Sequence, residues 1–249
     1  MGLRRRPRLA LAVTAVIAGL IGLAASVSGL VIGVMPRHFS AAEQQRIMSW
    51  EVGKRWRAWP AGKIFPATIT YRVPAGVLAS KTGLSLSARR VGIASQAPCA
   101  AAADAAAARV LAGYGCAALL RATYADATGA FVTTIGVAVL GRAGQGAAAQ
   151  AALPGSGELR PGVHAVGFPG TLTASFTDRS RQVSSSVPAG PYLVMYTAGF
   201  ADGRPRLPGD TDSYAERELL TAAERLAGYV ANRIGAPPAP LRCPGAPGC

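Results

Sequence analysis

The longest apolar segment of the chain runs from Leu9 to Met35, 27 residues without a charged side chain. Because about 20 apolar residues in helical form span a bilayer core, residues 9–35 are predicted to be a transmembrane helix. Four arginines lie within residues 1–8, just before this segment. Since basic residues tend to stay on the cytoplasmic side, we expect a cytoplasmic N-terminus and an exported, extracytoplasmic remainder.

A cleaved signal peptide is the alternative interpretation of this segment. The basic start, the apolar stretch and a run of small residues would suit one, the small residues being Ala24, Ala25, Ser26 and Ser28. The apolar run continues, however, through Leu30–Val34, beyond the length of a typical signal-peptide core. This length favours an uncleaved anchor and therefore a single-pass membrane protein.

Residues 36–62 are predicted to form a juxtamembrane amphipathic helix. Ser40 and Glu43 have the spacing of a capping box, and the next proline is Pro60. On a helical wheel, one face carries Met48, Val52, Trp56 and Trp59, and the opposite face carries Glu43, Arg46, Trp50, Lys54 and Arg57.

This helix also holds the predicted membrane contacts of the exported region. Tryptophan beside arginine and lysine is typical of the headgroup level of a bilayer. The predicted membrane-interface residues are Trp50, Lys54, Arg55, Trp56, Arg57 and Trp59. We expect the apolar face to pack onto the exported domain or to lie along the membrane. Stacking of a ligand on the tryptophans is the alternative role.

Residues 63–235 alternate between strand and helix patterns. Apolar and polar residues alternate along residues 66–74, as in a strand, whereas the alanine-rich residues 100–112 predict a helix. Residues 81–98 are predicted to be a loop with at most a short strand. Further strands are predicted at 117–124, 130–140, 163–166, 172–177, 182–187 and 192–200, and further helices at 144–153 and 213–234. The apolar stripe of the last helix consists of Leu219, Ala223, Leu226 and Val230.

This order of elements predicts an exported α+β domain over residues 63–235. Between Ile64 and Val166 the order is strand, helix, strand, strand, helix, strand, which is that of a ferredoxin-like split βαβ unit. Three further strands and a C-terminal helix would extend its sheet or form a second layer. Residues 236–249 are a proline-rich, cysteine-containing tail with little capacity to fold alone.

All four cysteines lie beyond the apolar segment, which agrees with an oxidising compartment. An even number of exported cysteines is typical of disulfides. Cys99 and Cys116 flank the alanine-rich helix, so pairing them would join its two ends. Cys243 and Cys249 bracket a short turn in the tail. These two local pairs are favoured over the other pairings of four cysteines.

The excess of basic residues in the exported region indicates the chemical class of its partner. Four of the 26 basic residues precede the apolar segment, which leaves 22 basic against 12 acidic residues in the remainder. A basic exported domain favours membrane lipid or an anionic envelope polymer as a partner, and an envelope protein is also expected. Nucleic acid is not expected, because no nucleic-acid motif occurs. A basic surface that merely follows an arginine-rich composition is the alternative.

Little in the sequence predicts catalysis. The two histidines are His38, beside the apolar segment, and His164, in a strand-like stretch. A Ser–His–Asp triad would have to use His164, and no GxSxG pattern occurs. The nearest approach to an acidic cluster is Asp202, Asp210 and Asp212, whose spacing suits turns and helix capping better than a calcium loop. No catalytic residue, cofactor or metal site is therefore predicted.

Several stretches carry a resemblance to known proteins. They are WPAGKIFPATITY (59–71), RRVGIASQAPCAAAAD (89–104) and GCAALLRATYADATGAFVTTIGVAVL (115–140). Together with the apolar anchor and the late capped helix, they resemble a family of uncharacterised actinobacterial single-pass membrane proteins. The resemblance implies a bacterial cell envelope, and it implies no activity and no catalytic residue.

The sequence therefore predicts a membrane-anchored, non-enzymatic cell-envelope protein whose exported domain binds a partner protein, lipid or wall component. A sensory or accessory subunit of a membrane complex is the first alternative. Such a subunit would need a signalling partner, because only residues 1–8 are expected in the cytoplasm. An envelope hydrolase that uses His164 or scattered carboxylates is the second alternative.

Overall fold

The structure, a computed structural model, describes residues 39–75, 83–155, 159–206 and 214–238. The predicted transmembrane helix at 9–35 and the Cys243–Cys249 pair lie outside these residues. Of the helices that are described, none is long and apolar enough to cross a membrane. Gln45–Pro238 form one unit, and the rest of the chain is assigned to a second.

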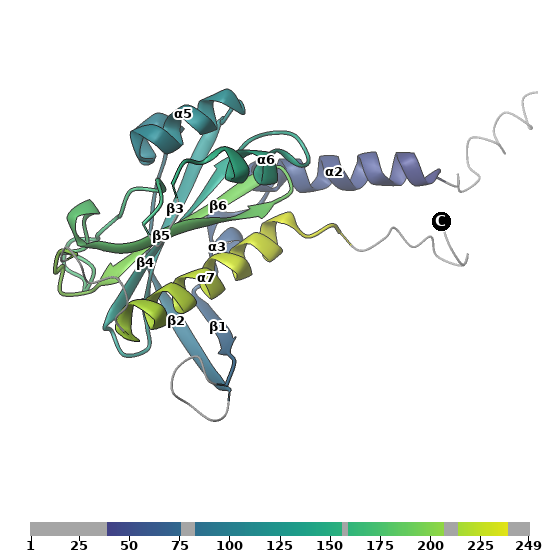
Figure 1. Cartoon of the computed structure of the whole chain (residues 1–249). Helices are drawn as coiled ribbons and strands as arrows, with labels where there is room; N and C mark the ends of the chain where they lie inside the picture. Colours follow the sequence, from purple (N-terminus) through teal and green to yellow (C-terminus); the bar gives the residue numbers. More distant parts are fainter. Residues whose placement is uncertain (1–38, 76–82, 156–158, 207–213, 239–249) are drawn as a thin grey trace, which may run out of the picture. The chain divides into compact units, whose positions relative to one another are not determined.

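A six-stranded antiparallel sheet forms the centre of the first unit (Figure 1). Neighbouring strands follow the order β1-β2-β3-β4-β6-β5, and every pair is antiparallel. The strands are β1 (Thr68–Val73), β2 (Leu84–Ala97), β3 (Ala118–Asp126), β4 (Phe131–Val139), β5 (Arg181–Ala189) and β6 (Tyr192–Phe200).

The predicted α+β class is confirmed, but the ferredoxin-like strand order is wrong. β2 is a strand of 14 residues where a loop with at most a short strand was predicted. It lies between β1 and β3, so the first four strands form a meander. The predicted strands at 163–166 and 172–177 are also wrong: the first makes an isolated bridge through Val163, and the second forms turns. Val163 and Phe176 are nevertheless buried, and burial of a loop residue gives the same apolar signal as a strand.

Helices cover both faces of the sheet. They are α2 (Ala41–Ala58), α3 (Ala61–Ile64), α4 (Cys99–Ala102), α5 (Ala105–Gly113), α6 (Gln145–Ala152) and α7 (Tyr214–Gly235). α7 contacts β1, β4, β5 and β6, whereas α4 contacts β3 and α6 contacts β5 and β6 from the opposite face (Figure 1). Because α7 touches both edge strands, β1 and β5, the sheet curls around this helix.

Alternation along the strands explains the two layers of helices. In β6, Tyr192, Val194 and Tyr196 pack with the α7 core, whereas Leu193 and Met195 pack with the core beneath α4, α5 and α6. The predicted stripe of α7 is buried at all four positions: Leu219, Ala223, Leu226 and Val230. The predicted start of this helix, at Ser213, lies outside the described residues.

Cys99 in α4 and Cys116 after α5 form the disulfide that was predicted, with their Cα atoms 6.3 Å apart. The two cysteines are 17 residues apart in sequence. Closing a loop of this size stabilises the fold by about 3 kcal/mol in the chain-entropy model. The disulfide therefore ties the start of α4 to the segment between α5 and β3.

Candidate functional site

The predicted capping box starts α2. The Ser40 backbone N–H and hydroxyl both donate to the Glu43 carboxylate, and the Glu43 N–H donates to Ser40 Oγ. These bonds satisfy N–H groups that lack a partner within the helix. The helix ends at Ala58, just before Pro60, and is therefore shorter than the helix predicted over residues 36–62.

One face of α2 packs onto the domain. Val52 is buried, and Trp56 and Trp59 are half-buried against the α7 core. The Tyr192 hydroxyl donates to the carbonyl oxygen of Val52 at 2.6 Å. The sequence left two positions for this face, on the domain or along the membrane, and the structure places it on the domain.

Arg55 belongs to this packed face and is not an exposed membrane-interface residue. Its side chain is only 5% exposed. Its Nη1 donates to the carbonyl oxygens of Ile234 and Ala236, at 2.9 and 2.6 Å. The last carbonyls of a helix lack partners within it and favour a nearby cation. Arg55 therefore fastens α2 to the C-terminal end of α7.

The opposite face of α2 presents a row of cations and one exposed tryptophan. We call this row the α2 stripe; it consists of Arg46, Trp50, Lys54 and Arg57, at spacings of four, four and three residues. Trp50 is 65% exposed. The Lys54 Nζ lies 3.6 Å from the centroid of the Trp50 ring and 2.9 Å from Glu51 Oε2. The stripe therefore combines a flat apolar ring with one cation, Lys54, in contact with it.

The other two tryptophans sit at the boundary between α2 and the domain. The Arg57 guanidinium carbon lies 4.3 Å from the Trp56 ring centroid. The Trp59 ring has Lys63 Nζ at 4.0 Å and the Arg55 guanidinium carbon at 4.8 Å from its centroid. Of the six predicted interface residues, the stripe thus keeps three, whereas Trp56, Trp59 and Arg55 contribute to packing.

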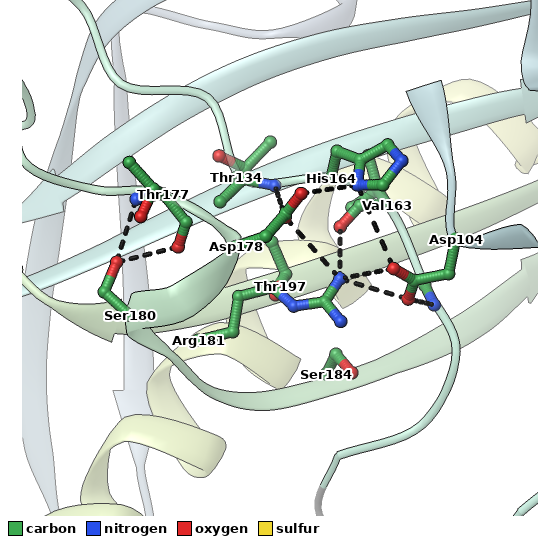
Figure 2. Close-up of polar contacts among 12 residues, drawn as sticks. Asp104, Thr134, Val163, His164, Thr177, Asp178, Ser180, Arg181, Ser184 and Thr197 are labelled. Carbon is green, nitrogen blue, oxygen red and sulfur yellow. Dashed lines mark hydrogen bonds and ion pairs between the residues drawn. The ribbon is translucent and has the colours of Figure 1, made fainter. Parts of the chain in front are cut away.

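A second polar cluster gathers around His164 and was not predicted from the sequence (Figure 2). His164 Nδ1 lies 2.6 Å from Asp178 Oδ2 and 3.9 Å from Asp104 Oδ1. Arg181 Nη1 lies 3.0 Å from both oxygens of Asp104 and 3.7 Å from Asp178 Oδ1. Asp104 precedes α5, His164 lies in the loop before β5, and Asp178 begins a short 3-10 helix (Asp178–Ser180), so no spacing pattern could reveal the cluster.

These side chains also hold the backbone of the loop that precedes β5. Asp104 accepts a hydrogen bond from the Gly162 N–H at 2.7 Å, and Asp178 accepts one from the Ala165 N–H at 2.8 Å. One residue further on, the Val166 N–H donates to Thr134 Oγ1 at 3.0 Å. Strand threonines and loop carboxylates thus replace the strand pairing that was predicted for residues 163–166.

The cluster has two parts of a catalytic triad, a histidine and a carboxylate that orients it. A triad also needs a hydroxyl or thiol at the second ring nitrogen. Within the described residues, the His164 ring forms hydrogen bonds through Nδ1 alone. What the described geometry supports is a clamp that fixes the loop to the sheet.

No protein-family model, curated protein or solved structure matches this chain. The resemblance to actinobacterial membrane proteins therefore stays a prediction, and the geometry of the described residues alone bears on function.

Proposed function

We propose that this chain is a membrane-anchored, non-enzymatic protein of the cell envelope. Its exported α+β domain is held at an anionic lipid surface by the α2 stripe, and there it binds a partner. The observation that carries the proposal is the 65% exposure of Trp50 beneath Lys54, on the one face of α2 that does not pack onto the domain.

Physical chemistry favours lipid as the contact of this stripe. Tryptophan rings and the long side chains of lysine and arginine are favoured at the headgroup level of a bilayer. Each basic residue near an anionic surface contributes about 1 kcal/mol. The stripe supplies Arg46, Lys54 and Arg57, and it follows closely on the predicted transmembrane segment at 9–35.

Quenching of Trp50 fluorescence by lipid tests this proposal. The full chain is placed in nanodiscs that contain either phosphatidylglycerol or phosphatidylcholine, each with and without bromine on the acyl chains. Subtracting the emission of the Trp50→Phe variant isolates Trp50 from the half-buried Trp56 and Trp59.

We expect brominated phosphatidylglycerol to quench the isolated Trp50 emission by more than brominated phosphatidylcholine does. Equal, weak quenching by both lipids would show that the α2 stripe faces water, and it would overturn the proposal.

A further inference from the structure

The sheet ends at β1, whose outer backbone groups face away from β2. Among the described residues, β1 pairs with β2 alone, and the Arg90 N–H donates to the carbonyl of Ala67 just before β1. In an antiparallel ladder, residues alternate between facing the partner strand and facing away. The Ala67 bond therefore directs the N–H and C=O groups of Thr68, Thr70 and Arg72 toward the open edge. We call these three residues the β1 edge.

Beside this edge, the curled sheet leaves a groove over α7. A pocket of about 410 Å³ is lined by Thr70 and Tyr71 on the β1 side, Val187 on the β5 side, and α7 residues between them. The α7 residue Gly228 lies in this floor, and no atom lies within 4 Å of the place where a Cβ would stand. An extended chain therefore has space next to β1, between the two edges of the sheet.

Two arginines lie at one end of this groove. Arg72 and Arg225 line an adjoining pocket of about 380 Å³ together with Val73, Pro74 and Gly83. No acidic residue lines that pocket, and the described residues include no ion-pair partner for either guanidinium. Glu224 lines the groove itself rather than this end. Two guanidinium groups that line one pocket favour a carboxylate.

We propose that the β1 edge accepts an extended, acidic segment of a partner protein as a seventh strand, with one of its carboxylates between Arg72 and Arg225. The free backbone groups of the edge supply main-chain hydrogen bonds, which is how strand addition gains affinity. A second copy of this chain would instead bring two more cations into the groove. This proposal rests on the proposed function, because it names the class of partner that the exported domain binds. It uses no residue of the α2 stripe, so strand addition can fail while lipid contact holds, and the reverse.

A random decapeptide library displayed on phage tests this proposal against the full chain in phosphatidylcholine nanodiscs. We expect enrichment of peptides in which Asp or Glu stands at a fixed distance from alternating β-branched residues. An enriched peptide, synthesised, should protect the amides of Thr68, Thr70 and Arg72 from hydrogen exchange, because these N–H groups face the open edge.

Three variants separate this site from general charge attraction. Arg72→Glu with Arg225→Glu should weaken the peptide roughly ten- to hundredfold, as expected for the loss of charge-assisted hydrogen bonds. Arg109→Glu, an exposed arginine of α5, should leave the affinity unchanged. Thr70→Pro removes one edge N–H without touching the β1–β2 ladder, so binding should fall while the thermal melting temperature stays close to that of the parent chain.

Failure to enrich any acidic peptide would overturn the proposal. So would an affinity that is indifferent to Arg72→Glu with Arg225→Glu, or one that falls equally with Arg109→Glu. Protection of amides elsewhere in the sheet, with the β1 edge unchanged, would place the peptide at a different surface and would equally contradict strand addition. None of these results bears on lipid contact by Trp50.

Discussion

The α2 stripe and the β1 edge are both cationic, but they differ in what stands beside the charge. On α2, Lys54 lies over an exposed indole ring, and the neighbouring backbone is already hydrogen-bonded within a helix. At the β1 edge, Arg72 and Arg225 stand beside unpaired backbone groups and a groove. An aromatic ring with cations matches a diffuse lipid surface, whereas free backbone with a cation pair matches one extended peptide. Net charge alone, which the sequence provides, does not distinguish these two kinds of partner.

The largest expected effect concerns lipid contact by the α2 stripe. Replacing Arg46, Lys54 and Arg57 together by glutamate removes three attractions and adds three repulsions. At about 1 kcal/mol for each charge near an anionic surface, the change is roughly 6 kcal/mol. The preference of the isolated Trp50 emission for brominated phosphatidylglycerol should disappear.

The same triple variant should bind the enriched acidic peptide as the parent chain does, since the β1 edge is untouched. A joint loss of lipid contact and peptide binding would show that the two surfaces are one site, and the comparison would fail.

A smaller effect is expected from the contact that joins α2 to α7. Arg55→Met removes hydrogen bonds to two carbonyls at the end of α7. Loss of such bonds from a buried charged group costs about 2–3 kcal/mol in free energy of unfolding, which urea denaturation measures. Arg57→Met, on the exposed face, serves as the matched control and should change the stability by no more than about 0.5 kcal/mol. Equal losses in both variants would mean that α2 does not use Arg55 to hold α7.

The smallest expected effect is a pH dependence shared by the two regions. Burial raises the pKa of Tyr192, beneath α2, and of Tyr71, in β1, to about 12. A tyrosine in the unfolded chain ionises near pH 10. Each hydroxyl therefore stays protonated to a higher pH in the folded state than in the unfolded chain. The stabilisation is complete below pH 10 and is lost as the pH rises through 12, by about 1.4 kcal/mol for each tyrosine at pH 11.

Urea denaturation between pH 8 and pH 12 measures this loss. Tyr192→Phe and Tyr71→Phe should each reduce the pH dependence by a similar amount. A parent chain whose stability is constant up to pH 12 would contradict burial of these two hydroxyl groups.

The sequence predicted the fold where an element carries a clear local signal, whether an apolar stripe, a continuous apolar run or a cap. The stripe of α7, the residues of β6 and the capping box of α2 all carry such signals, and the structure has them where they were predicted. β2 gave no clear signal because most of its residues are neither fully buried nor fully exposed. The ferredoxin-like order failed because β2 was missed and because residues 163–166, predicted as its last strand, make only an isolated bridge.

The candidate sites were predicted less completely than the fold. Adjacency in sequence grouped Arg55 with Lys54 and Arg57, whereas helical geometry turns Arg55 toward α7. The His164 cluster and the pair Arg72–Arg225 unite residues that are distant in sequence, and only the tertiary structure brings them together. The structure does place Trp50 and Lys54 together on the polar face of α2, as the sequence predicted.

Photo-crosslinking from two positions of the full chain tests the central claim most directly. A photoreactive amino acid replaces Trp50 in one variant and Thr70 in another, both in native-like membranes that contain phosphatidylglycerol, and the adducts are identified by mass spectrometry. The predicted result is phospholipid adducts at position 50 and none at position 70. Phospholipid adducts at both positions, or at neither, would contradict the assignment of the α2 stripe to the lipid surface and of the β1 edge to a protein partner.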